Sequence, residues 1–304
     1  MFHPSPRLRR AAYVSLDGTW TVSINGAPPV SITVPYPPES ALSGVASTPV
    51  GRTTLVYRRA FTLPEGFSKG GRLLLHLGAV DQYAEVRLNG VVIPNDSGET
   101  VAVTAYRQNV YDLTREILAD GENTLEITAT DNLEDAVIPY GKQRVKRGGM
   151  WYTPVSGIWQ SVWLEAVPEV YIRDLRVDST IPPDHSYATV RITAEGVDMG
   201  TVRITTPNGV IETALEGGVA TATLPAPRLW SPEHPYLYEY TVTAGEDFVE
   251  SYFALRTLTT EVVGGIPRLC LNGEPYFFHA LLDQGYFPDG ILTPPPPPPL
   301  SRTF

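Results

Sequence analysis

The sequence predicts an all-β protein built from antiparallel sandwiches, and three observations support this prediction. Apolar and polar residues alternate with a period of two through long parts of the 304-residue chain, as in strands with one buried and one solvated face. The chain holds 29 prolines and 26 glycines, too many helix breakers for a mostly helical protein. Asn-Gly pairs follow several alternating runs, and such pairs favour the tight turns of β-hairpins.

The first predicted domain spans residues 1–168 and contains two clear hairpins. Residues 20–26 and 84–93 each show strict alternation and an Asn-Gly pair that supplies two positions with positive φ. Residues 73–77 and 125–129 carry further inward apolar faces. We therefore expect a sandwich of antiparallel sheets here.

The second predicted domain spans residues 169–260, with a boundary near Pro168. Seven short strands in about 90 residues, separated by glycine or proline, are typical of an immunoglobulin-like sandwich. The predicted strands are 170–177, 187–194, 201–205, 210–214, 219–224, 237–243 and 248–258.

The third part, residues 261–304, has a different pattern. A hairpin is expected around Asn272-Gly273, followed by a buried strand over residues 276–282. Six consecutive prolines at 294–299 then predict an extended polyproline II segment.

Composition excludes several classes of partner. With 33 acidic and 23 basic side chains the formal charge is -10, which argues against nucleic acid as a partner. No apolar run approaches the ~18 residues of a membrane span, and no apolar stretch follows the basic N-terminus as in a secretory signal. Cys270 is the single cysteine. We expect a cytoplasmic protein without a membrane partner.

Sequence patterns for metal and cofactor chemistry are missing. The five histidines never show metal-ligand spacing, and no glycine-rich phosphate loop occurs. A Gly-x-Ser-x-Gly nucleophile turn is also absent. We therefore expect no metal and no cofactor.

Eight short segments of the chain form an ordered set. They are residues 16–20, 34–40, 57–61, 78–81, 88–90, 121–125, 157–160 and 229–232. Their order resembles glycoside hydrolase family 2, which includes β-galactosidases, β-glucuronidases and β-mannosidases. The resemblance covers roughly residues 4–293, and the ordered set is more specific than any single segment.

The resemblance implies a jelly-roll sugar-binding domain over 1–168, an immunoglobulin-like domain over 169–260 and the start of a (β/α)8 barrel over 261–304. A whole barrel needs about 250 residues. Retaining glycosidases of this kind use two carboxyl groups about 5 Å apart. In the family these are glutamates on late barrel strands, the acid/base following an asparagine, and this sequence has no Asn-Glu pair. We expect no catalytic residue here and a truncated, inactive chain.

An independent catalytic pair within the sandwiches is a weaker hypothesis. The acidic residues near apolar strands are Asp81, Glu85, Asp131, Asp135 and Glu165. Alternation places Glu85 on the polar face of its strand, and we expect Asp131 and Asp135 in a turn, bonded to their own backbone. Structural roles are favoured for these carboxylates.

Sugar contact is the expected function, since sugar rings stack on aromatic side chains at the rim of a concave site. Trp151 and Tyr152 lie in a segment that, in the family, approaches the barrel mouth, and packing or rim contact are equally expected for them. Trp159 and Trp163 are predicted to share one strand face and to pack in a core. By the resemblance, His279, Asp283 and Gln284 would deliver polar groups to the substrate.

The sequence departs from the family pattern at two places. Residues 94–100 stand where the family commonly has a histidine and a Gly-Gly pair, and Ala280 follows His279 where glycine is common.

The chain is expected to be the N-terminal part of a β-galactosidase-like enzyme. The alternatives are a stand-alone carbohydrate-binding module and a fragment that docks onto a barrel of another chain. Self-association through exposed apolar surface is also expected, opposed by the net charge.

Overall fold

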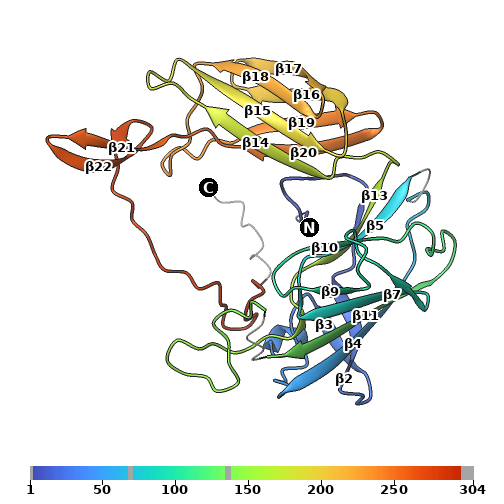
Figure 1. The fold of residues 1–304 in the computed structure, drawn as a ribbon. Coiled ribbons are helices and arrows are strands. Elements are labelled where there is room, and N and C mark those ends of the chain that lie inside the picture. Colours follow the sequence, from blue (N-terminus) through green and yellow to red (C-terminus); the bar gives the residue numbers. More distant parts are fainter. Residues whose placement is uncertain (1–2, 68–70, 134–137, 296–304) are drawn as a thin grey trace, which may run out of the picture. The chain divides into compact units, whose positions relative to one another are not determined.

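A computed structural model describes residues 3–67, 71–133 and 138–295, and their regular secondary structure is almost entirely β (Figure 1). Within them the one helix is a short 3-10 turn, η1 (Ala41–Ser43). The all-β prediction is confirmed. No helix among the described residues is long and apolar enough to cross a membrane.

The chain forms two compact units. The large unit comprises Ala12–Ala166 and Asp283–Phe304, and the small unit comprises Met1–Ala11 and Val167–Leu282. Each unit is thus made of two separate stretches of chain, so the residues that follow the second sandwich in sequence return to the first.

The large unit contains three antiparallel sheets. Their strand orders are β1-β13-β5-β10, β3-β2-β4-β11-β7-β8 with β9 also paired to β7, and β12-β6. The strands are β1 (Tyr13–Ser15), β2 (Gly18–Ile24), β3 (Val30–Val34), β4 (Arg52–Phe61), β5 (Arg72–Leu77), β6 (Val80–Asp81), β7 (Tyr83–Leu88), β8 (Val91–Ile93), β9 (Val101–Val103), β10 (Asn109–Asp112), β11 (Asn123–Asn132), β12 (Gly157–Ile158) and β13 (Val162–Val167).

Both predicted hairpins of the large unit are confirmed. In β7–β8, Leu88 pairs with Val91 across Asn89 and Gly90, whose φ angles are 51° and 85°. These are the positive values that a two-residue turn requires. After β2, the N–H of Ala27 donates to the carbonyl of Ile24 at 3.0 Å, and the chain returns as β3.

The core of the large unit lies between the inward faces of its sheets, where the alternation predicted it. Leu73, Leu75 and Leu77 of β5 and the apolar positions of β11 are all buried in one cluster. Because these residues belong to different sheets, their burial joins the two main layers of the sandwich.

The small unit carries seven strands in the order β14-β15-β18-β17-β16-β19-β20. Neighbours β17 and β18 pair only at Glu216 and Val219, so the sheet opens there into the two layers of a sandwich around one core. The strands are β14 (Asp174–Thr180), β15 (Tyr187–Glu195), β16 (Met199–Thr206), β17 (Gly209–Glu216), β18 (Val219–Pro225), β19 (Tyr238–Ala244) and β20 (Asp247–Phe253).

The seven strands predicted for this region all form, with shifted ends at the first and last. The first begins at Asp174 rather than at residue 170, because the preceding Ile172 directs its N–H to the side chain of Asp247 at 2.8 Å. The last ends at Phe253 rather than at residue 258, since Leu255 already accepts a hydrogen bond from the loop residue Trp230.

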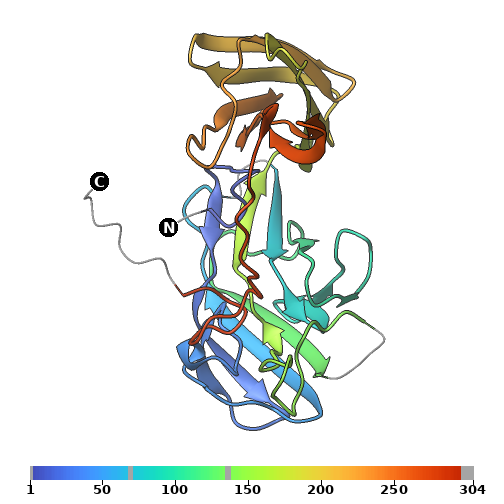
Figure 2. The same ribbon diagram turned by 90° about the vertical axis from the view of Figure 1, so that its left-hand side faces the viewer.

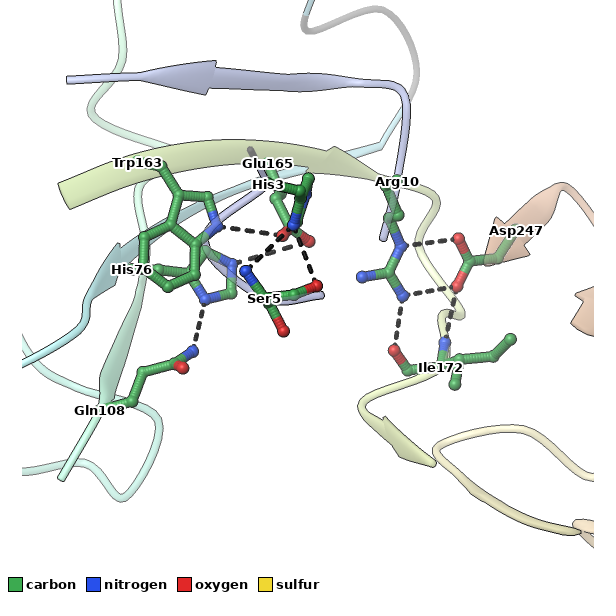
Figure 3. A network of polar contacts seen from close by, with 9 residues as sticks. All are labelled: His3, Ser5, Arg10, His76, Gln108, Trp163, Glu165, Ile172 and Asp247. Atoms are coloured by element: carbon green, nitrogen blue, oxygen red, sulfur yellow. Dashed lines mark hydrogen bonds and ion pairs between the residues drawn. The ribbon is translucent and has the colours of Figure 1, made fainter. Parts of the chain in front are cut away.

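A buried ion pair fastens the N-terminal residues to this sandwich (Figure 3). The Nε of Arg10 donates to Oδ1 of Asp247 at 2.9 Å and a terminal nitrogen donates to Oδ2 at 2.8 Å. A two-bond contact of this kind suits the planar guanidinium and fixes its orientation.

The predicted hairpin around Asn272-Gly273 is confirmed, but the buried strand expected over residues 276–282 does not form. The chain forms β21 (Leu258–Val263), β22 (Ile266–Leu271) and β23 (Glu274–Pro275) and then continues without regular structure. Leu281 and Leu282 are 97% and 88% exposed. A strand apolar on both faces is stabilised by neighbouring strands and covering helices, and no described strand pairs with this segment.

Residues 283–295 return to the large unit, as the red segment beside the blue and green strands in Figure 2 shows. We call residues 283–293 the C-terminal strap. Most of the predicted polyproline segment, residues 296–299, lies outside the described residues.

Candidate functional site: a buried carboxyl cluster beside an aromatic loop

Three carboxylic acids from separate elements gather within the large unit, and we call them the carboxyl cluster. Glu39 precedes η1, Asp81 ends β6 and Asp131 lies near the end of β11. Asp131 and Asp81 are 0% and 1% exposed, and Glu39 is partly buried. The charge of Asp81 acts on both Glu39 and Asp131, and the charge of Glu39 acts on Asp131.

Two of these carboxyl groups hold the loop of residues 143–156. The hydroxyl of Ser156 donates to Oε1 of Glu39 at 2.6 Å, and its backbone N–H donates to Oε2 at 3.2 Å. Gln143 donates from Nε2 to Oδ2 of Asp81 at 3.2 Å, while its Oε1 accepts the N–H of Val155 at 2.8 Å. The cluster therefore fixes both ends of this loop.

The third carboxyl group has no side-chain partner in the described chain, and its position in a strand corrects the prediction of a turn. Asp131 lies inside β11, opposite Thr53 of β4, and of the described groups the backbone N–H of Asn132 is the one that acts on its carboxyl group as a donor and lowers its pKa. The period-two register that buries Ile127 and Ala129 places Asp131 on the same core face. Asp135, predicted beside it, lies outside the described residues.

Burial raises the pKa of all three carboxyl groups into the neutral range. It raises the pKa of Glu39 to about 8, although both hydrogen bonds from Ser156 act in the opposite direction. It raises the pKa of Asp81 to about 7, against the lowering effect of Gln143. Burial, with the charges of Asp81 and Glu39, raises the pKa of Asp131 to about 8. A buried carboxyl without a cationic neighbour favours its neutral form.

This arrangement does not suit glycoside hydrolysis. A retaining mechanism needs one carboxyl to attack the sugar and another to protonate the leaving oxygen, and both must touch the substrate. Asp81 and Asp131 are shut off from solvent. No group of three or more His, Cys, Asp or Glu side chains in the described ranges is placed to hold a metal ion.

The loop of residues 143–156 carries two aromatic side chains, Trp151 and Tyr152, and each contacts another side chain through its ring. The guanidinium carbon of Arg144 lies 4.1 Å from the ring centre of Trp151. The ring of Tyr152 stacks on Tyr286 of the C-terminal strap, with centroids 4.0 Å apart and planes at 13°. Both Trp151 and Tyr152 remain partly exposed, so each has one ring face occupied and part of its surface open.

Two family models match this chain in succession. The glycosyl hydrolase 2 galactose-binding domain-like model matches residues 41–178, and the glycosyl hydrolases family 2 model matches residues 170–256. The chain belongs to glycoside hydrolase family 2.

Curated relatives and solved structures agree with the family 2 assignment. A β-glucuronidase of Felis catus is 24% identical over 253 residues, covering 74% of this chain and 38% of the relative. A β-galactosidase of Thermoanaerobacter pseudethanolicus is 24% identical over 247 residues, covering 76% and 32%. The β-D-glucuronidase structure of Dictyoglomus thermophilum matches with TM-score 0.75 at 20% identity, covering 97% of this chain and 52% of that chain. This chain therefore spans about a third of those relatives and about half of that structure.

The two tryptophans predicted to share a strand in this family 2 chain do not. Strand β12 ends at Ile158 and β13 begins at Val162, so Trp159 lies in the connection between them. Trp159 packs in a small cluster with Ala79, Val155 and Ile291, whereas Trp163 stacks on His76 at 4.8 Å. Both tryptophans are buried, as expected, but they pack against different groups of residues.

The polar residues assigned to the first barrel strand of family 2 lie on irregular chain. His279 is exposed beside the ring of Phe277. Asp283 is exposed and accepts the N–H of Gly285 at 2.8 Å, and Gln284 is partly buried. His279 belongs to the small unit, Asp283 and Gln284 to the large one. Their contact with substrate stays a prediction.

The two other described acidic residues near apolar strands, Glu85 and Glu165, both accept hydrogen bonds from side chains. Glu85 lies on the outer face of β7 and accepts from Nε of Arg87 at 2.8 Å. Glu165 is buried and accepts the indole N–H of Trp163 at 3.0 Å (Figure 3). The sequence did not predict Glu39 as a member of this site. Nothing in its local sequence indicates that it binds Ser156, which lies more than a hundred residues later in the chain.

Proposed function

We propose that residues 1–304 form the non-catalytic N-terminal part of a family 2 glycoside hydrolase whose whole chain hydrolyses terminal β-glycosides with retention. The names of the relatives, β-glucuronidase and β-galactosidase, support this substrate class. In this proposal residues 1–168 are the jelly-roll sugar-binding domain, 169–260 the immunoglobulin-like domain and 261–304 the start of the barrel. The compartment is the cytoplasm.

The observation that carries the proposal is the state of the acidic residues. Asp81 and Asp131 are shut off from solvent and burial raises their pKa values, and the sequence has no Asn-Glu pair. This part of the enzyme therefore supplies no nucleophile and no acid/base of its own.

Substrate contact from this part is assigned to Trp151, Tyr152, His279, Asp283 and Gln284. The two aromatic side chains keep part of their surface open and offer apolar faces on which sugar rings stack. The three polar side chains belong to the segment that the resemblance places at the first barrel strand.

Inactivity is tested with the purified chain from a host that lacks β-glycosidases. Aryl β-galactosides and β-glucuronides are expected to show no turnover above the buffer. Turnover that is lost in the variant Glu39→Gln but retained in Glu85→Gln would show that the cluster is catalytic and that the proposal is wrong.

A stand-alone carbohydrate-binding module is the second candidate, favoured by the partly open rings of Trp151 and Tyr152. Calorimetry against galactosides, glucuronides and plant polysaccharides tests it. Heat of binding that is lost in Trp151→Ala but not in Trp20→Phe, a core change, supports a module. No heat with any ligand rejects it.

A docking fragment is the third candidate, favoured by the exposed apolar side chains of Phe277, Leu281 and Leu282. Such surface is unusual on a finished monomer. Mixing the chain with a separately expressed family 2 barrel tests this idea, and activity no greater than that of the barrel alone rejects it.

A further inference from the structure

The C-terminal strap is anchored to the large unit at both polar and apolar points. The hydroxyl of Thr293 donates to the carbonyl of Trp159 at 2.6 Å, and the hydroxyl of Ser40 donates to the carbonyl of Asp289. Ile291, with Tyr286 and Leu292, packs into the small apolar cluster that contains Ala79, Val155 and Trp159. The strap thus covers an apolar surface of the sandwich.

Two of the residues that the strap contacts, Ser40 and Val155, are neighbours of the carboxyl cluster. Ser40 directly follows Glu39. Val155 precedes Ser156, which binds Glu39, and its own N–H is held by Gln143, which binds Asp81. Through these neighbours Glu39 and Asp81 are linked to residues that the strap contacts, whereas no side-chain hydrogen bond links Asp131 to them in the described chain.

The strap also contacts the surroundings of the cluster through aromatic rings. Ala79, two residues before Asp81, accepts the N–H of Trp159. The ring of Tyr286 stacks on Tyr152. Burial raises the pKa of Tyr286, and the charges of Tyr152 and then Asp81 raise it further.

The groups that face the cluster provide no compensating positive charge. They include Tyr57 from β4, Tyr106 from the loop after β9, Tyr286 from the strap, and the neutral side chains of Gln143 and Ser156. Arg52 of β4 and Tyr83 of β7 line a surface hollow together with Asp131. No described Arg or Lys acts on any of the three acids. The hydroxyl of Tyr57 is fully buried, and burial together with the charge of Glu39 raises its pKa.

We propose that the carboxyl cluster of Glu39, Asp81 and Asp131 is a pH-sensitive latch that holds the C-terminal strap against the large unit when neutral and releases it when ionised. Ionisation places two or three like charges in one dry site, which is costly without cations or water. Opening the strap and the loop of residues 143–156 admits water to them. The latch does not depend on the proposed function.

The direction follows from proton linkage. The carboxyls bind protons more tightly in the docked state than an exposed carboxyl, whose pKa is about 4. Docking is therefore strongest below about pH 4 and weakens as pH rises toward 8, the upper value in the docked state. Each group that returns to its ordinary pKa on release changes the docking equilibrium by up to about tenfold per pH unit.

Hydrogen exchange of the full chain, measured by mass spectrometry at pH 5, 7 and 9 and corrected for intrinsic rates, tests the latch. The amides of Phe287 and Ile291 are hydrogen-bonded within the strap and report on its order. We expect strap exchange to be at least about tenfold faster at pH 9 than at pH 5, with exchange in β4 and β11 unchanged. Equal protection of the strap at both pH values overturns the proposal, as does equal loss in the whole sandwich.

Matched variants assign the effect to the cluster. Asp81→Asn and Asp131→Asn mimic the neutral acids and keep their shape, so the double variant is expected to lose most of the pH response. Glu85→Gln, on the outer face of β7, is the control and is expected to keep it. A double variant that folds and retains the full response contradicts the latch. If that variant does not fold, each single substitution must reduce the response, and two singles with the wild-type response overturn it.

Discussion

Asp131 in the large unit and Asp247 in the small unit are the same residue type at the same depth, yet the two units treat them in opposite ways. Their exposed fractions are 0% and 2%. Asp247 receives two hydrogen bonds from Arg10 and one from the backbone of Ile172 (Figure 3), whereas no described side chain donates a hydrogen bond to the carboxyl group of Asp131. Burial by itself therefore does not decide the chemistry of a carboxyl group.

The difference is one of compensation. A paired and hydrogen-bonded carboxylate can stay charged in a sandwich core, and its removal leaves the partner's charge exposed to the same apolar surroundings. An unpaired carboxyl avoids this cost by holding its proton. In the small unit Asp247 thus binds Arg10 and holds the N-terminal residues to the sandwich. In the large unit the raised pKa of Asp131 brings its change of charge into the neutral pH range.

The largest effect is expected for Asp247→Ala. The substitution leaves the guanidinium of Arg10 buried without its carboxylate, and we expect a loss of about 3–5 kcal/mol in the unfolding free energy of the small unit. Urea unfolding, with hydrogen exchange in β20 to assign the transition, measures it. Asp178→Ala removes an exposed pair with Arg176 at 2.9 Å and is the control, expected at about 1 kcal/mol or less. Similar losses for the two variants would contradict this role of Asp247.

Asp131→Asn is expected to change stability in a pH-dependent way. Because burial raises the pKa of Asp131 to about 8, folding of the wild type becomes less favourable as pH rises from about 4 to 8, and an amide has no such dependence. Relative to wild type, the variant should gain about 1–3 kcal/mol between pH 5 and pH 9. Urea unfolding of the large unit at both pH values checks this. A pH-independent difference would place an ionised Asp131 in the fold.

Ser156→Ala tests whether a partner shifts the balance within the cluster. The hydroxyl of Ser156 lowers the pKa of Glu39, so its loss should raise that pKa further above 8. It should also cost about 1 kcal/mol for one lost hydrogen bond. Infrared titration of the carboxyl band follows the proton directly. Thr128→Ala, an outward position of β11, provides a comparison that should leave the titration of Glu39 in place.

The smallest effect is expected for Glu85→Gln. Glu85 is partly exposed and paired with Arg87 across 2.8 Å, and surface substitutions of this kind stay within about 0.5 kcal/mol. Thermal unfolding between pH 5 and pH 9 should run parallel to the wild type. A strong pH dependence introduced by this change would mean that charge outside the cluster governs the large unit.

Local patterns predicted most of the strands. Alternation at residues 73–77 and 125–129 located the core of the large unit, and Asn89-Gly90 located a turn, since both depend only on neighbouring residues. The same alternation, extended by one step from Ala129, also predicts that Asp131 faces inward. We expected a turn because aspartate is common in turns, but Asp131 lies within β11 and follows the alternation of that strand.

The barrel strand expected at residues 276–282 shows the limit of this approach. Its apolar sequence suits a strand, but a strand also needs neighbours, and the described chain pairs none with it. Trp159 and Trp163 show a similar limit, because a break between β12 and β13 gives two residues four apart different surroundings.

By itself the sequence determined the all-β class, the hairpins, the seven strands of the small unit and the family resemblance, because these depend on residue order and on side-chain direction within one strand. Only the tertiary structure decided that Glu39, Asp81 and Asp131 share one dry site and that Arg10 compensates Asp247. These contacts join residues dozens to hundreds of positions apart. The charge of a buried acid depends on what other strands and loops bring to it, and no local pattern records that.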